Sequence, residues 1–141
     1  MQKMETSFHY LLMANQALIH KKLLAGLKDT DLSLGQPKIL EYLKVHNGSS
    51  QKDIASGCHI EAGSLTSVLG RMEDKGMIER KMLNGNRRSL YVFLTKKGEQ
   101  LQETVEKEFA FLEDLAFEGI SEDEREIFMD LFFKIYHNLN A

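Results

Sequence analysis

Residues 61–75 combine small, hydroxyl-bearing and cationic side chains at a spacing typical of a helix. At about 100° per residue, one side of this helix must pack inward, because it carries Leu65, Val68, Leu69 and Met72. The opposite side presents Gly63, Ser64, Ser67, Gly70 and Arg71, with Thr66 at its margin. Short side chains let a helix approach DNA closely, and Arg donates hydrogen bonds to guanine or phosphate. This face suits a DNA major groove, although the same residue types are equally common on solvent-exposed helices.

A basic loop follows this helix closely. The runs Met77 to Met82 and Leu90 to Leu94 flank Asn84-Gly85-Asn86, which predicts a β-hairpin. Cationic residues gather at and around its turn: Arg80, Lys81, Arg87, Arg88, Lys96 and Lys97. Such a loop can enter a narrow minor groove, where the negative potential favours Arg. A charged edge that prevents strand aggregation is the alternative, but the position next to helix 61–75 favours DNA binding.

The net charge of −3 conceals a strong asymmetry along the chain. Residues 1–59 hold 7 basic and 5 acidic residues, residues 60–98 hold 8 and 4, and residues 99–141 hold 3 and 12. The segment that carries both DNA-binding features is therefore at +4, whereas the last third is at −9. An anionic partner is attracted to the middle of the chain and repelled by its end.

The composition indicates one globular domain over residues 1–141, since 43% of the residues are hydrophobic. No apolar run reaches the roughly 18 residues that span a bilayer, and no secretory signal is present, so we expect a cytoplasmic protein without a membrane partner. The single cysteine agrees with a reducing compartment. Because Gly-rich phosphate loops and the HExxH and GxSxG motifs are absent from the sequence, we expect no enzyme and no cofactor.

The apolar periodicity predicts six helices around the hairpin. The first four cover about residues 5–27, 36–45, 50–57 and 61–75, the fifth runs for about 20 residues from position 95, and the sixth covers about 121–139. The third and fourth are joined by Cys58-His59-Ile60 and have the dimensions of a helix-turn-helix. The expected capping residues are Ser33 with Gln36, Ser50 with Asp53, Gly76, Thr95, and Ser121 with Glu124.

Four local strings in this order are similar to those of a known family. They are Leu34-Gly35-Gln36-Pro37-Lys38-Ile39-Leu40, Gln51-Lys52-Asp53-Ile54-Ala55, the run from Arg71 to Arg80, and Asn86-Arg87-Arg88 followed by Leu94-Thr95-Lys96-Lys97-Gly98. With them, nearly the whole chain resembles the MarR family of winged helix-turn-helix transcriptional regulators. The resemblance implies a mainly α fold with a small β-hairpin wing. Residues 33–95 would form the DNA-binding lobe, and residues 5–30 and 96–141 a helical dimerisation lobe.

The resemblance also implies how DNA is read. Members of the family are homodimers that place the fourth helix in the major groove and the wing in the minor groove of a pseudo-palindromic operator, usually as repressors. The positions that match the family's recognition helix are Ser64, Thr66, Ser67 and Arg71, and Arg88 matches the wing-tip Arg. Two positions depart from the family pattern: Asn86 replaces the usual Asp of the wing, and Ser67 stands where many relatives have a basic residue.

Large apolar residues in the last third of the chain favour a dimer. Among them are Phe109, Phe111, Phe117, Phe128, Phe132, Phe133 and Tyr136. A monomeric core would absorb some of these side chains, but a two-fold protein that reads half-sites about 34 Å apart needs a rigid support. A fifth helix of about 30 Å provides that support.

The resemblance implies that a small aromatic or phenolic effector binds between the two lobes. Tyr10, His20, Tyr42 and His46 lie on the first two helices and are candidates to line that crevice, although such residues are more often surface residues. Cys58 is expected to pack as a small apolar residue. Cys58, His59 and Glu61 lie on a tight turn with no second cluster, so we expect no metal. The alternative function is a winged-helix protein-interaction module that does not bind DNA.

Overall fold

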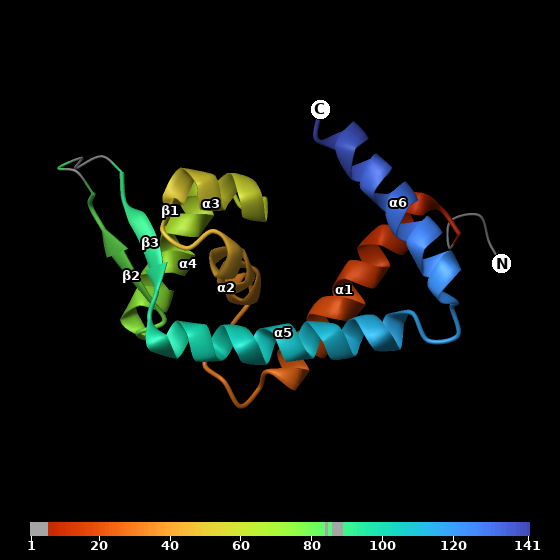
Figure 1. Ribbon diagram of the computed structural model, residues 1–141, viewed down its shortest axis with the longest axis horizontal. Helices are drawn as coiled ribbons and strands as arrows, with labels where there is room; N and C mark the ends of the chain where they lie inside the picture. Colours follow the sequence, from red (N-terminus) through yellow and green to blue (C-terminus); the bar gives the residue numbers. More distant parts are fainter. Residues whose placement is uncertain (1–5, 84, 86–88) are drawn as a thin grey trace. The chain divides into compact units, whose positions relative to one another are not determined.

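The computed structural model describes residues 6–83, 85 and 89–141, and Figure 1 shows its elements. The described residues form six helices and three short strands. They are α1 (Phe8–Gly26), α2 (Gln36–Val45), β1 (Ser49–Ser50), α3 (Gln51–Cys58), α4 (Ala62–Asp74), β2 (Ile78–Lys81), β3 (Tyr91–Leu94), α5 (Lys96–Ala116) and α6 (Glu122–Leu139). The prediction of a mainly α fold with a small hairpin is confirmed.

The helices begin where hydroxyl side chains cap them. The Ser50 hydroxyl accepts the backbone N–H of Asp53 at 3.1 Å, which starts α3. Thr95 accepts the N–H of Gly98 at 3.1 Å and starts α5 in the same way. Ser121 and Glu124 form both halves of a capping box at the start of α6. These three predicted caps are confirmed.

The predicted capping box at the start of α2 is only half present. The Gln36 side chain accepts the N–H of Ser33 at 3.0 Å, but Ser33 is not the N-cap. Gly35 occupies that position in a left-handed conformation with φ of 88°, and no side chain caps the helix. The missing side-chain cap leaves fewer N–H groups without a partner, because Pro37 in the first turn has no backbone N–H.

The sheet contains one strand more than the predicted hairpin. β2 and β3 pair antiparallel with Ile78 opposite Leu94 and Lys81 opposite Tyr91. β1 adds to the other edge of β3, so that the sheet order is β1-β3-β2. Because β1 is only two residues long, it carries no alternating pattern that sequence could reveal.

The core lies where α2, α3, α4 and the sheet meet. Its fully buried side chains come from each of these elements and include Ile39, Leu40, Leu43, Ile54, Leu65, Leu69, Met72, Met77, Ile78 and Val92. Gly57 on α3 allows close packing there, because a Cβ at this position would lie 2.3 Å from the Tyr42 ring. The glycine is therefore needed for the α2–α3 contact, and α3 ends one residue beyond it, at Cys58.

The chain forms two compact units, Met1–Phe109 and Ala110–Ala141. The first contains the helix-turn-helix, the sheet, α1, and the first part of α5. In the second, the Phe117 ring meets the Phe128 ring edge-on with centroids 5.9 Å apart, and the Arg125 guanidinium lies over Phe117 at 4.3 Å. No helix in the described part of the chain is both long and apolar enough to cross a membrane.

Candidate nucleic-acid interface

The two sides of α4 differ as the sequence predicts. Leu65, Leu69 and Met72 are buried, and the opposite side is open to solvent. Its exposed residues are Gly63, Ser64, Thr66, Ser67 and Arg71. The described candidates of the predicted DNA-binding site therefore share one accessible face of one helix.

Hydrogen bonds within α4 organise this face. The Thr66 hydroxyl donates to the carbonyl oxygen of Ala62 at 3.2 Å, which directs it along the helix. Arg71 Nη1 donates to the Ser67 hydroxyl at 3.1 Å, one turn away. Arg71 is thereby held against the helix while its remaining N–H donors are available to a ligand.

Two glycines on this side have no packing role within the chain. A Cβ built at Gly63 or at Gly70 would meet nothing within 4 Å. Glycine inside a helix costs about 0.5–1 kcal/mol relative to alanine. Since the described fold does not require a glycine at position 70, its small size is consistent with close approach of something outside the chain.

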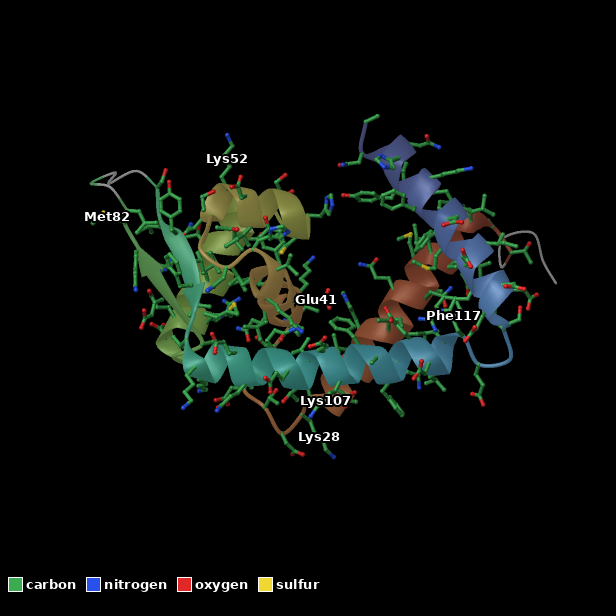
Figure 2. The ribbon with its side chains drawn as sticks, viewed as in Figure 1. Lys28, Glu41, Lys52, Met82, Lys107 and Phe117 are labelled. Carbon is green, nitrogen blue, oxygen red and sulfur yellow. The ribbon has the colours of Figure 1, made fainter. Side chains whose placement is uncertain are left out.

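The turn between α3 and α4 positions the exposed face. His59 adopts a left-handed conformation with φ of 54° directly after α3. The N–H of Ile60 then donates to the carbonyl oxygen of Ala55 at 3.0 Å, which closes the turn. Lys52 on α3 points outward from this lobe (Figure 2) and adds a cation near the same helix pair.

The base of the predicted wing is present as the β2–β3 ladder. Lys81 ends β2, and its ammonium lies 3.4 Å from the Glu79 carboxylate and 5.3 Å from the centre of the Phe93 ring. Arg87 and Arg88, the two wing residues of the predicted site, lie outside the described residues, as does Asn86. Their assignment to DNA binding stays a prediction.

Arg80 differs from its predicted role in a basic surface. Its Nε and Nη2 donate to Glu73 Oε1 at 3.2 and 3.0 Å, and its backbone N–H donates to Glu73 Oε2 at 3.0 Å. Hydrogen bonds from the Arg80 side chain are the main reason why the pKa of Glu73 is lowered. The Arg80 side chain is only 20% exposed, so its charge is engaged inside the protein.

Comparison with known proteins identifies the fold and shows which family the chain resembles. Residues 32–90 match the model of the MarR family. The uncharacterized HTH-type transcriptional regulator YwoH of Bacillus subtilis is 29% identical over 126 residues, which are 88% of this chain and 91% of YwoH. The S. aureus MepR–DNA complex superimposes with a TM-score of 0.87 and 25% identity, over 96% of this chain and 99% of MepR. The chain is similar to MarR-family proteins, most directly over residues 32–90. A crystal structure of MarR itself agrees, with a TM-score of 0.87, 25% identity, and coverage of 99% of this chain and 94% of MarR.

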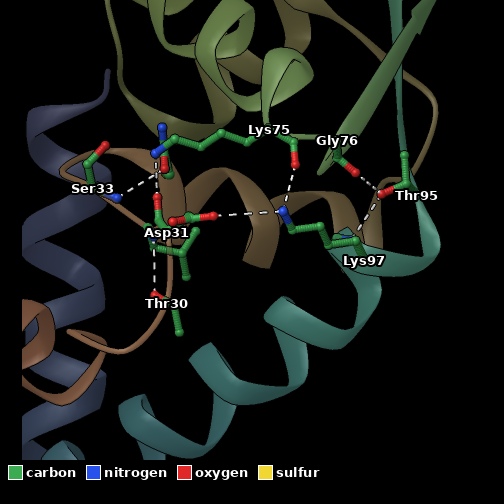
Figure 3. Close-up of polar contacts among 10 residues, drawn as sticks. Thr30, Asp31, Ser33, Lys75, Gly76, Thr95 and Lys97 are labelled. Atoms are coloured by element: carbon green, nitrogen blue, oxygen red, sulfur yellow. Dashed lines mark hydrogen bonds and ion pairs between the residues drawn. The ribbon is translucent and has the colours of Figure 1, made fainter.

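The family match and the similarity to YwoH indicate a transcriptional regulator. A polar junction anchors the C-terminal end of α4, as Figure 3 shows. The Lys75 ammonium donates to the carbonyl oxygen of Asp31, and the Lys97 ammonium donates to the carbonyl oxygen of Lys75 at 2.7 Å. Lys97 also lies 3.9 Å from the Asp31 carboxylate. Lys97 therefore joins α5 to α4, which differs from its predicted role in the basic surface.

Thr95 completes this junction. Its hydroxyl donates to the carbonyl oxygen of Gly76 at 2.6 Å while accepting the N–H of Gly98. Gly76 has a φ of 76°, the left-handed conformation expected of the residue that terminates α4. One side chain thus connects the end of the exposed helix to the start of α5.

Of the remaining candidates in the described part of the chain, Cys58 has a packing role. Cys58 is buried, and burial raises the pKa of its thiol, which agrees with the predicted packing role. Among residues 6–83, 85 and 89–141, no group of three His, Cys, Asp or Glu side chains is arranged to hold a metal ion. The ring centroids of Tyr42 on α2 and of His46, which directly follows α2, lie 4.7 Å apart, whereas Tyr10 and His20 lie on α1.

Proposed function

We propose that this chain is a MarR-family regulator that binds a pseudo-palindromic site in double-stranded DNA as a homodimer and represses transcription in the cytoplasm. The observation that carries the proposal is the exposed face of α4, where small and hydroxyl side chains surround Arg71 on a helix of a helix-turn-helix. The similar MepR structure is a complex with DNA. The proposal assigns the chain no catalytic activity and no cofactor.

Each site residue has a role in this proposal. Ser64, Thr66, Ser67 and Arg71 contact base edges or phosphates in the major groove, because hydroxyl and guanidinium groups supply the donors and acceptors that base edges recognise. Gly63 admits the phosphate backbone close to the start of α4. Arg87 and Arg88 enter the neighbouring minor groove from the wing, where they contribute to affinity for all sequences.

The homodimer is supported by exposed apolar surface. No side chain of α6 is buried, although every residue of this helix is described. Large apolar side chains remain exposed on it: Ile127, Phe128, Met129, Leu131, Phe132, Phe133, Tyr136 and Leu139. On α1, Phe8, Leu11, Leu12, Met13 and Leu18 are exposed as well. So much exposed apolar surface is typical of a protein interface, and we propose that residues 5–30 and 96–141 form the dimerisation lobe and residues 33–95 the DNA-binding lobe.

We further propose that a small aromatic molecule releases the repressor from DNA. Tyr42 on α2 and His46 directly after it carry half-exposed or exposed rings, and α2 packs against α3 of the helix-turn-helix. A ligand that contacts this pair lies next to an element that positions α4, so its binding energy can favour one arrangement of the helices over another.

Selection of bound fragments from the source genome tests the proposed function. Purified protein is mixed with sheared genomic DNA at moderate salt, and the retained fragments are sequenced. The proposal expects enrichment of a few fragments that share an inverted repeat with half-sites about 34 Å apart. Retention of no fragment, even at low salt, contradicts it and favours a protein-interaction module.

A further inference from the structure

The Glu73 carboxylate accepts three hydrogen bonds from Arg80. Both oxygens are used, because Oε1 accepts Nε and Nη2 of Arg80 and Oε2 accepts its backbone N–H. Arg80 Nη1 also reaches Gln51 Oε1 at 3.4 Å. A planar guanidinium held by a carboxylate in this way has a fixed direction, which a single ammonium cannot achieve.

These contacts connect the elements that would have to bind the same DNA duplex at the same time. Glu73 lies in the last turn of α4, two residues beyond Arg71. Arg80 lies on β2 opposite Val92 of β3. Gln51 begins α3, and its backbone N–H donates to the carbonyl oxygen of Leu90 at 3.1 Å, just before β3. The recognition helix, the hairpin and the start of α3 therefore share one hydrogen-bonded network.

We infer that Glu73 and Arg80 are positioning residues that set the direction of the wing relative to α4, so that both elements fit adjacent grooves of one duplex. Between α4 and β2 the chain is only three residues long, and the third strand of the sheet, β1, pairs with β3 and not with β2. The contacts between Glu73 and Arg80 therefore connect β2 directly to α4. The inference rests on the proposed DNA binding. It assigns Arg80 an action through Glu73 rather than through contact with DNA.

The substitution Glu73→Gln separates this account from simple electrostatics. Removing a negative charge beside a DNA-binding helix would by itself strengthen attraction to phosphates. We call the hydrogen-bonded pair of Glu73 and Arg80 the clamp. In the clamp, the substitution replaces one carboxylate oxygen by an NH₂ group that faces an N–H donor of Arg80. The wing then loses its fixed direction, and apparent affinity falls with the fraction of molecules that remain competent to bind.

The binding test uses the full chain and a duplex that the wild-type protein selects from a random pool. We expect Glu73→Gln to weaken binding about tenfold, which corresponds to a competent fraction of about one tenth. The control Glu79→Gln removes the same charge from the exposed neighbour on β2, and its affinity should stay equal to that of the wild type or increase. All variants are compared at a temperature at which circular dichroism shows them folded.

Arg80→Lys distinguishes positioning from direct contact. Lysine keeps the charge but lacks the fork, so the clamp account expects a loss similar to that of Glu73→Gln, with an unchanged slope of log affinity against log salt. If Arg80 instead contacted a phosphate directly, lysine would keep that contact, and affinity would stay near that of the wild type. Wild-type affinity in Arg80→Lys, or in Glu73→Gln, overturns the inference.

Hydrogen exchange provides a readout that needs no DNA. We expect the backbone amides of residues 78–81 and 91–94 to exchange at least several times faster in Glu73→Gln than in Glu79→Gln. Equal exchange in the two variants overturns the clamp. If the wild type selects no duplex at all, the proposed function fails and the inference fails with it, whereas equal binding by wild type and Glu73→Gln overturns the inference alone.

Discussion

The ammonium of Lys97 donates a hydrogen bond of 2.7 Å to the carbonyl oxygen of Lys75. This contact joins the first turn of α5 to the residue that follows α4, at the point where the helix leaves carbonyl groups without intrahelical partners. A cation at a helix C-terminus also interacts favourably with the helix dipole. The α4–α5 junction is therefore stabilised by a lysine that the charge pattern alone assigns to the DNA-binding surface.

We predict that Lys97→Met lowers the free energy of unfolding by about 1 kcal/mol. A hydrogen bond from a charged group contributes more than a neutral one, but Lys97 is 48% exposed, so water screens part of the effect. Urea denaturation followed by circular dichroism measures the change. The neighbouring substitution Lys96→Met is the control and should alter stability by less than about 0.5 kcal/mol. Equal effects of both substitutions would contradict a specific role of Lys97.

Gly70→Ala and Gly57→Ala should change stability in opposite directions. A Cβ at Gly70 meets nothing within 4 Å, so alanine should stabilise α4 by about 0.5–1 kcal/mol. A Cβ at Gly57 would lie 2.3 Å from the Tyr42 ring, so alanine there should destabilise by about 1–3 kcal/mol. Thermal denaturation checks whether each substitution stabilises or destabilises the protein.

The substitution Gly70→Ala should also affect DNA binding. If the exposed face of α4 approaches DNA closely, Gly70→Ala should weaken DNA binding although it stabilises the protein. Unchanged DNA binding would contradict a functional role of Gly70.

The contribution of Glu73 to stability should depend on pH. Hydrogen bonds from Arg80 lower the pKa of the Glu73 carboxyl in the folded protein. A group with a lowered folded-state pKa stabilises the fold above its unfolded-state pKa, and the stabilisation is lost as the pH falls through the folded-state value. The difference in urea midpoint between wild type and Glu73→Gln should therefore be present at pH 7 and shrink below about pH 4. A difference that is constant from pH 7 to pH 3 would argue against the ion pair.

Wing and helix residues should differ in how they affect DNA binding. We predict that Arg88→Ala weakens binding to all duplexes and reduces the slope of log affinity against log salt by about 0.9, as loss of one phosphate contact does. Arg71→Ala and Ser67→Ala should instead change which sequence is preferred, by about 1–3 kcal/mol at the affected base pair. Competition binding with a randomised operator distinguishes these outcomes. Uniform effects of all three substitutions would refute the division of roles.

The apolar face of α6 should hold the homodimer together. Leu131→Glu places a charge on this exposed apolar face, and burial of an unpaired charge at an interface costs several kcal/mol. We expect the dimer dissociation constant to rise about 100-fold or more. Sedimentation velocity at micromolar concentration measures the change, with Glu126→Gln on the same helix as the control. A wild-type monomer would contradict the dimer directly.

Local signals account for what the sequence predicts correctly. The caps at Ser50, Thr95 and Ser121 depend on residues only three positions away, and each is present. The two sides of α4 follow from helical periodicity, which places Leu65 inside and Arg71 outside. Short-range chemistry therefore suffices for most helix boundaries and for the accessible face of the recognition helix.

Contacts between elements account for what the sequence cannot predict. A basic residue in a basic segment is predicted to be part of a charged surface. In the folded chain, however, Arg80 donates hydrogen bonds to Glu73, and Lys97 donates one to Lys75. Likewise, β1 exists only because β3 offers it a free edge. In the sequence, Gly57 predicts the end of a helix. In the fold, its missing side chain leaves space for the Tyr42 ring.

If the exposed face of α4 binds a specific duplex, equilibrium binding shows it most directly. The affinity of the wild type for a duplex selected from its source genome is measured against a scrambled duplex of equal length at two salt concentrations. We predict that the selected duplex binds at least about 1,000-fold more tightly, that affinity for both falls steeply with salt, and that Arg71→Ala reduces the difference between them. Equal affinity for the two duplexes, or no binding to either at low salt, would contradict the account.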